Sequence, residues 1–161
     1  MPYSDLDFNN KSILITGGAG FIGSNLAMYL QENYPKAAIC VFDCFRSEVK
    51  MSNGNLQSYG HFNNLVGFKG DIICGNINAN EDLRLLENYK FDYIFHQAAI
   101  SDTRAYDQEL VMKTNVNSFY FFLELAKKKP RYKEGDAPVE GPVLWEGLFS
   151  SLEYTAIQNQ E

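Results

Sequence analysis

The amino-acid sequence predicts an α/β fold: a doubly wound, mainly parallel sheet of about four or five strands with helices on both faces. Short apolar, β-branched runs alternate along the chain with stretches in which apolar residues recur at helical spacing. A glycine-rich turn joins the first such strand to the first helix, and an aspartate ends the second strand. The length of 161 residues fits one domain, and 45% hydrophobic with 21% charged residues is ordinary for a folded protein.

The first βαβ unit is expected over residues 12–43. Residues 12–16 read Ser-Ile-Leu-Ile-Thr, which favours a parallel strand buried on both faces. After the glycine turn at 17–23, helical spacing continues until Tyr34-Pro35 and is carried by Ile22, Leu26, Tyr29 and Leu30. Residues 38–42 predict a second apolar strand, which ends at Asp43.

The elements that follow keep the same alternation. Residues 44–66 are polar and rich in Asn and Gly, which predicts a long connection over the surface. We expect a third strand at 71–77, a short exposed helix at 81–88 and a fourth strand at 92–96. Helical spacing then extends over 108–129, and Pro130 ends that helix.

The texture of the sequence changes after residue 130. Glycines and prolines interrupt any helical period until residues 148–157, which could form a short strand or helix. We therefore expect one domain over residues 1–129 and an atypical segment over 130–161, either a strand-five-like stretch or a tail.

Composition and charge exclude several classes of function. The net charge of −6 and the pI near 4.9 argue against binding to nucleic acid or to an anionic membrane surface. The chain shows no signal peptide and no apolar run approaching the roughly 20 residues that span a bilayer, so the expected compartment is the cytoplasm. The cysteines are odd in number and match no metal-binding spacing, so we expect buried thiols without a disulfide framework or structural zinc: Cys40, Cys44 and Cys74.

The strongest functional signal is the turn Thr-Gly-Gly-Ala-Gly-Phe-Ile-Gly at residues 16–23. It lies between a buried strand and an amphipathic helix, where a Rossmann-type fold binds the pyrophosphate of a dinucleotide. We expect Gly17 to permit the tight turn, Gly20 to let the backbone approach the pyrophosphate, and Gly23 to let the helix pack closely on the strand. The helix N-terminus would offer N–H groups to the phosphates.

Asp43 is expected to accept hydrogen bonds from the adenosine ribose of NAD. Arg46 and Lys50 follow it and could instead pair with the 2′-phosphate of NADP. The sequence leaves the choice between NAD and NADP open.

Four segments together resemble the extended short-chain dehydrogenases/reductases of the NAD-dependent epimerase/dehydratase family: TGGAGFIG, the Asp after strand two, His96 to Ala99, and Thr114-Asn115. The resemblance covers residues 12 to about 129 and implies enzymes that act on nucleotide sugars. Within that family, the segments FRS, GHFNNL, HQAAISDT and QELVMKTN are most similar to ADP-glyceromanno-heptose 6-epimerases. The domain at 1–129 is therefore expected to bind NAD or NADP.

The resemblance also implies roles for individual residues. It assigns Phe21 and Ile22 to the pyrophosphate, Cys44 to the adenosine ribose beside Asp43, and Asn76 and Ile77 to adenine. Many relatives have Asp where this chain has Asn76, whose side-chain carbonyl can still accept from the adenine amino group. The residues nearest the nicotinamide would be Gln97, Ala98, Ala99 and Ser101.

Three further residues are expected to matter less directly. Asn115 resembles a helix asparagine that braces the backbone of the active site. Ser101 and Thr103 could contact a sugar, although loop residues of this type are usually only solvated. We expect His96 to be a core histidine without a chemical role.

The family's chemistry needs a Tyr with a Lys four residues later, because the Lys lowers the pKa of the Tyr that takes the proton while hydride passes to the nicotinamide and back. None of the ten tyrosines has that Lys, and Leu148-Phe149-Ser150-Ser151 with Tyr154 only partly resembles the family's fifth strand. We therefore expect a fold truncated before the substrate domain, with no catalytic residues of its own, as a truncation or frameshift would produce.

Two classes of function stay open. The first is the cofactor-binding part of a nucleotide-sugar epimerase, inactive alone, whose full-length relative would use an ADP-linked heptose in lipopolysaccharide synthesis. The second is a standalone dinucleotide-binding or protein-interaction module, and exposed apolar surface would favour a homo-oligomer. A weaker alternative is a structural fragment that binds no cofactor.

Overall fold

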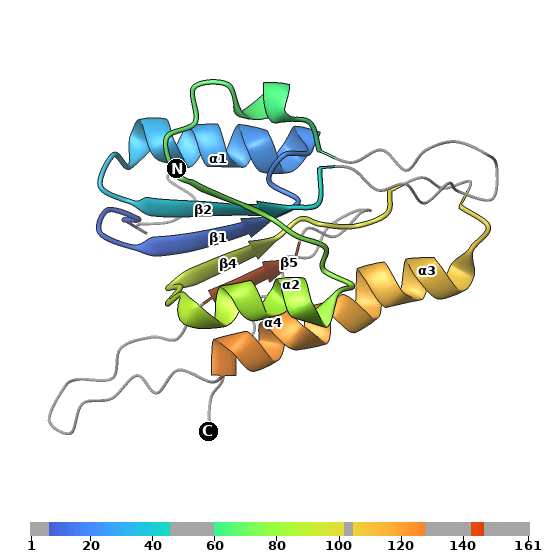
Figure 1. Ribbon diagram of the computed structural model, residues 1–161. Helices are drawn as coiled ribbons and strands as arrows, with labels where there is room; N and C mark the ends of the chain where they lie inside the picture. Colours follow the sequence, from blue (N-terminus) through green and yellow to red (C-terminus); the bar gives the residue numbers. More distant parts are fainter. Residues whose placement is uncertain (1–6, 46–59, 102–104, 128–142, 147–161) are drawn as a thin grey trace, which may run out of the picture.

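The computed structural model describes residues 7–45, 60–101 and 105–127, and the backbone of 143–146. Its centre is a parallel five-stranded sheet in the order β3-β2-β1-β4-β5 (Figure 1). The strands are β1 Ser12–Thr16, β2 Ala38–Asp43, β3 Asp71–Cys74, β4 Tyr93–His96 and β5 Val143–Glu146. The predicted doubly wound fold is confirmed.

The strand order reverses at β1, which pairs with β2 on one side and with β4 on the other. Ile13 of β1 stands in register with Ile39 of β2 and with Tyr93 of β4. The loops that leave the carboxyl ends of β1 and β4 therefore diverge to opposite faces of the sheet. In open parallel sheets ligands bind at such a switch point.

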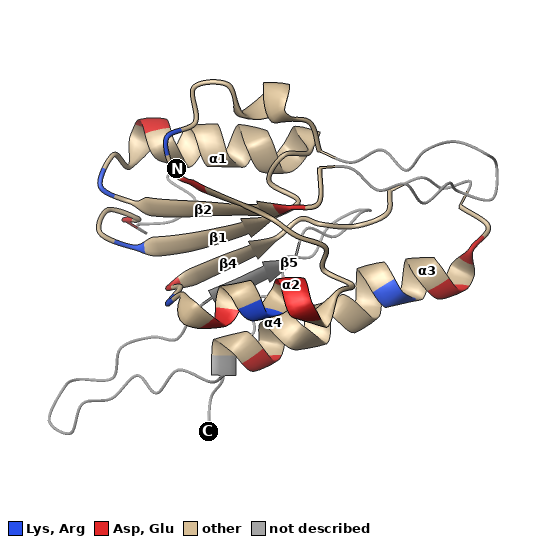
Figure 2. Ribbon diagram, in the orientation of Figure 1, with Lys and Arg blue, Asp and Glu red and all other residues tan. Residues whose placement is uncertain are grey.

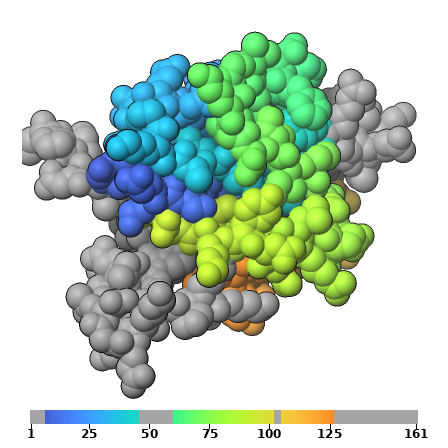
Figure 3. Space-filling model, turned by 60° about the vertical axis from the view of Figure 1, so that its left-hand side comes forward, coloured from blue at the N-terminus to red at the C-terminus, as the bar shows by residue number. Residues whose placement is uncertain are grey.

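Helices cover both faces of the sheet (Figure 1). Helix α1, Phe21–Asn33, lies on one face together with the 3-10 turn η1, Phe62–Leu65. The segment after residue 60 packs against α1 in the space-filling view (Figure 3). The other face carries α2 Asn80–Leu83, η2 Arg84–Asn88, α3 Gln108–Met112, the π-helical turn η3 Lys113–Asn117 and α4 Ser118–Lys127.

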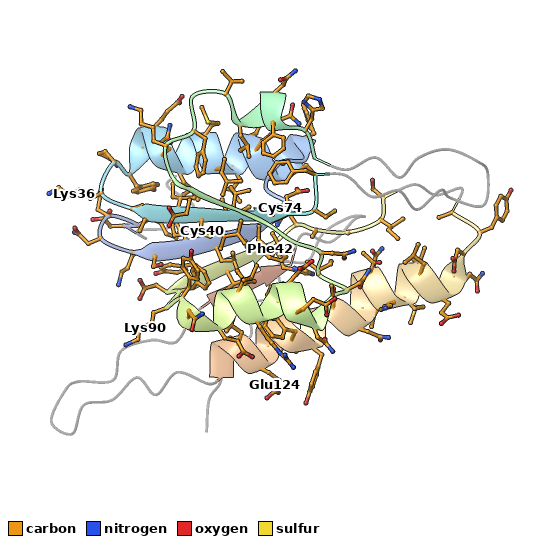
Figure 4. All side chains as sticks on the ribbon, viewed as in Figure 1. Lys36, Cys40, Phe42, Cys74, Lys90 and Glu124 are labelled. Carbon is orange, nitrogen blue, oxygen red and sulfur yellow. The ribbon has the colours of Figure 1, made fainter. Side chains whose placement is uncertain are left out.

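Alternation along the strands builds two apolar cores, one on each face. Ile13 and Ile15 of β1 pack toward α1, whereas Leu14 packs toward α4 with Phe42 and Phe122. Phe42 lies in the layer of side chains beside the sheet (Figure 4). The prediction that residues 12–16 form a strand buried on both faces is thus confirmed for β1.

Three elements differ from the sequence expectation. Strand β3 ends at Cys74 instead of continuing to Ile77, because Asn76 turns the chain by accepting from the N–H of Asn78 at 2.9 Å. The long connection expected at 44–66 contains η1, which begins after His61, whose Nδ1 accepts from the N–H of Asn63 at 3.1 Å. The single helix expected at 108–129 has a π-helical turn at its centre.

The segment at 130–161 contributes β5, which pairs with β4 in parallel. Residues 148–157, where the sequence predicts a short strand or helix, lie outside the described residues. Among the residues that the structure describes, no helix combines the length and the apolar character needed to cross a membrane.

Charged groups lie mainly at the ends of strands and on the outer surfaces of helices (Figure 2). A lysine precedes each of the first four strands, at the amino end of the sheet: Lys11, Lys36, Lys69 and Lys90. Lys36 and Lys90 are labelled in Figure 4. All four lysines lie at the amino ends of the strands, whereas the loops that follow β1 and β4 lie at the carboxyl ends. The lysines are therefore too distant to bind an anion held by those loops.

Candidate functional site

The turn after β1 is shaped by a glycine that no other residue can replace without strain. Gly17 has a φ of +65°, in the left-handed region, and its N–H donates to the carbonyl of Phe42 at 2.8 Å. A Cβ at this position would lie 2.7 Å from the backbone nitrogen of Ala98. The turn therefore rests directly on the backbone that follows β4, and the two loops of the switch point touch.

The other two glycines of the motif differ from each other in their surroundings. A Cβ at Gly23 would collide with the carbonyl of Gly17 and lie 2.7 Å from the Cα of Gly18. The crowding therefore comes from the turn itself and not from the strand. At Gly20 the nearest atom to a Cβ is the carbonyl oxygen of Gly17, at 3.1 Å. A Cβ at Gly20 would thus make one tight contact, which is less crowding than at Gly17 or Gly23, and its other surroundings are open.

The N-terminus of α1 is open. Its N-cap residue is Gly20, and no side chain among the described residues caps it. Phe21 and Ile22 in the first turn are 84% and 54% exposed. The N–H groups of a helix's first turn have no partners within the helix, and with the helix dipole they attract anions.

Asp43 is buried at the carboxyl end of β2, where both of its carboxylate oxygens accept backbone hydrogen bonds. Oδ2 accepts from the N–H of Ala19 at 3.0 Å, and Oδ1 accepts from the N–H of Phe45 at 2.9 Å. The side chain thus ties strand β2 to the glycine turn. Each oxygen keeps a lone pair that could accept from a ribose hydroxyl. The contact of Asp43 with a ribose stays a prediction.

The residues that follow Asp43 are partly described. Of the three cysteines expected to be buried, Cys40 is buried and Cys44 is half-buried, but Cys74 is exposed because it ends the edge strand β3. Burial, followed by the Asp43 carboxylate, raises the pKa of the Cys44 thiol to about 12. It is therefore a neutral thiol near neutral pH. Arg46 and Lys50, expected near a 2′-phosphate, lie outside the described residues.

Asn76 and Ile77 form the turn after β3. The Oδ1 of Asn76 is occupied by the N–H of Asn78, and the N–H of Asn76 donates to Oδ2 of Asp82 at 2.8 Å. Ile77 is 8% exposed and its side chain belongs to the core beside Leu83. Contact with adenine would therefore involve the second lone pair of the amide or the backbone of this turn, and it stays a prediction.

The loop after β4 is joined to β1 by the backbone and by one hydroxyl. The N–H of Gln97 donates to the carbonyl of Thr16 at 3.1 Å, and that of Ala98 donates to its Oγ1 at 3.3 Å. Ala99 and Ser101 are exposed beyond this junction, and Thr103 lies outside the described residues. The contact of these residues with a nicotinamide stays a prediction.

His96 lies beneath this junction. It is 6% exposed, its Nδ1 is 2.7 Å from Oγ1 of Thr16, and its ring packs on that of Phe122 with centroids 4.6 Å apart. Its Nε2 has no hydrogen-bond partner among the described residues. Burial lowers its pKa to about 4, so it is neutral near neutral pH, as fits a core histidine.

Asn115 braces the same loop from the π-helical turn. Its Oδ1 accepts from the N–H of Ile100 at 2.7 Å, and its Nδ2 donates to the carbonyl of Ile100 at 3.0 Å. This pair of bonds satisfies a whole residue of loop backbone with one side chain. π-helical turns inside α-helices are frequently found at functional sites.

Sequence reasoning did not single out two groups that complete the arrangement. The hydroxyl of Thr16 joins β1, His96 and Ala98, and the segment from Gly60 to Asn64 lies on the glycine turn. Thr16 was named as the last residue of the first strand and the first residue of the glycine motif, with no role for its hydroxyl. GHFNNL contributed only to a resemblance, because its contact with the turn is made across the long connection and has no local signature.

Comparison with known proteins agrees with this geometry. The model of the family described as "NAD dependent epimerase/dehydratase family" matches residues 13–133. The solved ADP-L-glycero-D-manno-heptose-6-epimerase of Helicobacter pylori is 55% identical with a TM-score of 0.68, over 79% of this chain and 39% of that chain. The Bordetella bronchiseptica enzyme WbmG, solved in complex with NAD, is 28% identical with a TM-score of 0.57, over 73% and 34%.

A curated relative, the ADP-L-glycero-D-manno-heptose-6-epimerase of Brachyspira hyodysenteriae, is 35% identical over 103 residues, which is 64% of this chain and 29% of that protein. A dTDP-D-glucose 4,6-dehydratase of Dictyostelium discoideum is 31% identical over 119 residues, 73% of this chain and 26% of that protein. The chain thus spans less than a third of either curated relative.

Proposed function

The chain belongs to the NAD dependent epimerase/dehydratase family, and on that premise we propose that it binds NAD as the cofactor-binding part of a nucleotide-sugar epimerase. The observation that carries this proposal is the uncapped N-terminus of α1 at Gly20. A Cβ at Gly20 would meet a single backbone atom of the fold, so the fold alone gives little reason for a glycine there. The pyrophosphate would lie there, because backbone N–H groups and the helix dipole attract its negative charge. The lysines lie at the amino ends of the strands and cannot reach it.

NAD is proposed over NADP because Asp43 would receive the adenosine ribose. A carboxylate accepts from ribose hydroxyls and repels a 2′-phosphate at the same place. The family is also described as NAD dependent. The residues proposed to form the NAD site are Gly17, Gly20, Phe21, Ile22, Gly23, Asp43, Cys44, Asn76, Ile77, Gln97, Ala98, Ala99, Ser101 and Asn115. Arg46 and Lys50 would take part only if the cofactor were NADP, through its 2′-phosphate.

For the epimerase as a whole we propose an ADP-linked heptose as the substrate. The 55% identity with the Helicobacter pylori ADP-L-glycero-D-manno-heptose-6-epimerase supports this choice. The bound nicotinamide would take a hydride from the sugar and return it. The function proposed for these residues is cofactor binding without turnover, since the proton-transferring Tyr-x-x-x-Lys pair is not among them.

Isothermal titration with NAD and NADP tests the proposal. We expect the chain to bind NAD more tightly than NADP. Gly20→Ala should raise the Kd for NAD by at least about tenfold, because the added Cβ would crowd the pyrophosphate. Circular dichroism melting of the same variant is the control, since this Cβ meets only one backbone atom in the fold. A folded chain that binds neither dinucleotide would contradict the proposal.

A second candidate function is a protein-interaction module or homo-oligomer. The observation that favours it is a stripe of exposed apolar side chains at every fourth position of the α3–α4 helix: Met112, Val116 and Tyr120, which are 53%, 52% and 66% exposed. Exposed apolar patches commonly mark contact surfaces. The same titration separates the two functions, because this surface does not require a dinucleotide.

A further inference from the structure

Ala19, in the middle of the glycine turn, is held from two sides. The residue is fully buried, and its N–H donates to Oδ2 of Asp43 at 3.0 Å. Its carbonyl oxygen accepts two hydrogen bonds, from the N–H of His61 at 3.0 Å and from Nδ2 of Asn64 at 2.8 Å. Two consecutive peptide groups of the turn are therefore oriented by residues from outside it.

The segment that donates to the Ala19 carbonyl, residues 60–65, packs closely on the turn. A Cβ at Gly60 would collide with the Cβ of Ala19 and lie 2.7 Å from Oδ2 of Asp43, so the backbone can approach only as glycine. Phe62 stacks on Phe45 with ring centroids 3.9 Å apart and planes at 7°. Leu65 is 5% exposed in the core beneath α1. The position of Asn64 is thus fixed on both sides along the chain.

The orientation of the Ala19 carbonyl matters for the start of α1. The same peptide group carries the N–H of Gly20, which donates to the carbonyl of Gly17 at 3.0 Å. Rotation of this group would move Gly20, the N-cap, and with it the N–H groups of the first helical turn. Asn64 is the one side chain among the described residues that holds the carbonyl in place.

We infer that Asn64 is a positioning residue for the pyrophosphate site: through the Ala19 carbonyl it sets the direction of the N–H groups at the start of α1. The inference rests on the proposed binding of NAD. It assigns to the GHFNNL segment a part in cofactor binding, without contact between Asn64 and the cofactor. Asn64 and Asp43 would then orient the turn together, because Asp43 accepts a hydrogen bond from the neighbouring peptide group.

The test compares Asn64→Ala with Asn63→Ala in the full chain. Asn63 is exposed on the same turn, and only its backbone forms hydrogen bonds with described residues. We expect Asn64→Ala to raise the Kd for NAD about two- to tenfold, the effect of one lost hydrogen bond, and Asn63→Ala to leave it unchanged. Adenosine, which has no diphosphate, should lose no affinity in either variant.

A second pair of variants and a direct measurement sharpen the result. Asn64→Asp keeps the shape of the side chain but removes its N–H donor and adds a negative charge. Asn63→Asp adds the same charge without removing that hydrogen bond, so only Asn64→Asp should raise the Kd for NAD. Hydrogen exchange of the unliganded chain should accelerate at Gly20 and Phe21 in Asn64→Ala and not in the strands. Equal Kd values for Asn64→Ala and Asn63→Ala, or equal losses for NAD and adenosine, would overturn the inference. A wild-type chain that binds no NAD would instead overturn the proposed function, and the inference with it.

Discussion

His96 shows how far burial can alter a single residue. Oγ1 of Thr16 accepts from the N–H of Ala98 and also shares a hydrogen bond with Nδ1 of His96, whose direction depends on the tautomer of the ring. The other ring nitrogen, Nε2, is buried without a partner among the described residues. A positive charge on the ring would leave water for this buried position, so burial favours the neutral form.

We expect the free energy of unfolding to fall as the pH drops from about 6.5 toward about 4. Burial lowers the pKa of folded His96 from 6.5 to about 4, so in this range the unfolded chain takes up a proton that the folded chain does not. The contribution is fully present above pH 6.5, and the loss reaches roughly 2 kcal/mol at pH 5 and roughly 3 kcal/mol below pH 4.

Urea unfolding at about pH 7.5 and about pH 5 measures this loss. His96→Gln should remove the histidine's share of the difference, since glutamine does not titrate. The difference that remains in His96→Gln measures the share of the other titrating groups. Equal pH dependence in the wild type and His96→Gln would show that the histidine is not responsible.

At the scale of elements, the joint between β1 and α1 depends on glycines for two separate reasons. Gly17 and Gly23 are required by the fold, since added side chains meet the backbone of the loop after β4 and of the turn itself. Gly20 is proposed to be required by the cofactor, because a Cβ there would meet a single backbone atom of the fold. A pattern of three glycines cannot separate these roles, but the contacts can.

Gly17→Ala should therefore cost stability, whereas Gly20→Ala should cost mainly affinity. We expect Gly17→Ala to lower the free energy of unfolding by about 2–4 kcal/mol, from the left-handed φ and the contact with Ala98 together. For Gly20→Ala we expect a loss below about 1 kcal/mol. Denaturant unfolding of the two variants measures both values, and equal losses would contradict the separation of roles.

At the scale of the whole molecule, stability depends on two apolar layers that share one sheet. Phe42 and Phe122 are both fully buried, and Phe122 attaches α4 to the face opposite α1. This layer also carries His96 and the helix that holds Asn115. Loosening α4 should therefore disturb the loop after β4 as well as the core.

Phe122→Ala should destabilise the chain by about 3–5 kcal/mol, because it removes a large buried ring and leaves a cavity. Tyr120→Ala, two residues earlier and 66% exposed, should change the free energy of unfolding by less than about 1 kcal/mol. Thermal and urea unfolding of both variants test this. A small effect at Phe122 would mean that α4 contributes little to the core.

The sequence by itself determined the class of fold, the order of β1, α1, β2 and β4, the glycine turn and the family. These properties are local: apolar runs, helical periods and glycines at set spacings are written in neighbouring residues. The early end of β3 and the π-helical turn in the last helix were not predicted, because hydrogen bonds of individual Asn and Ser side chains decide them.

Only the tertiary structure decided how the site is assembled. It brought Asn64 onto the carbonyl of Ala19 across 45 positions, and His96 onto Thr16 across 80. It also buried the side chain of Ile77 and engaged both oxygens of Asp43 with backbone donors. Such contacts depend on the three-dimensional approach of distant segments, and no pattern of neighbouring residues records them.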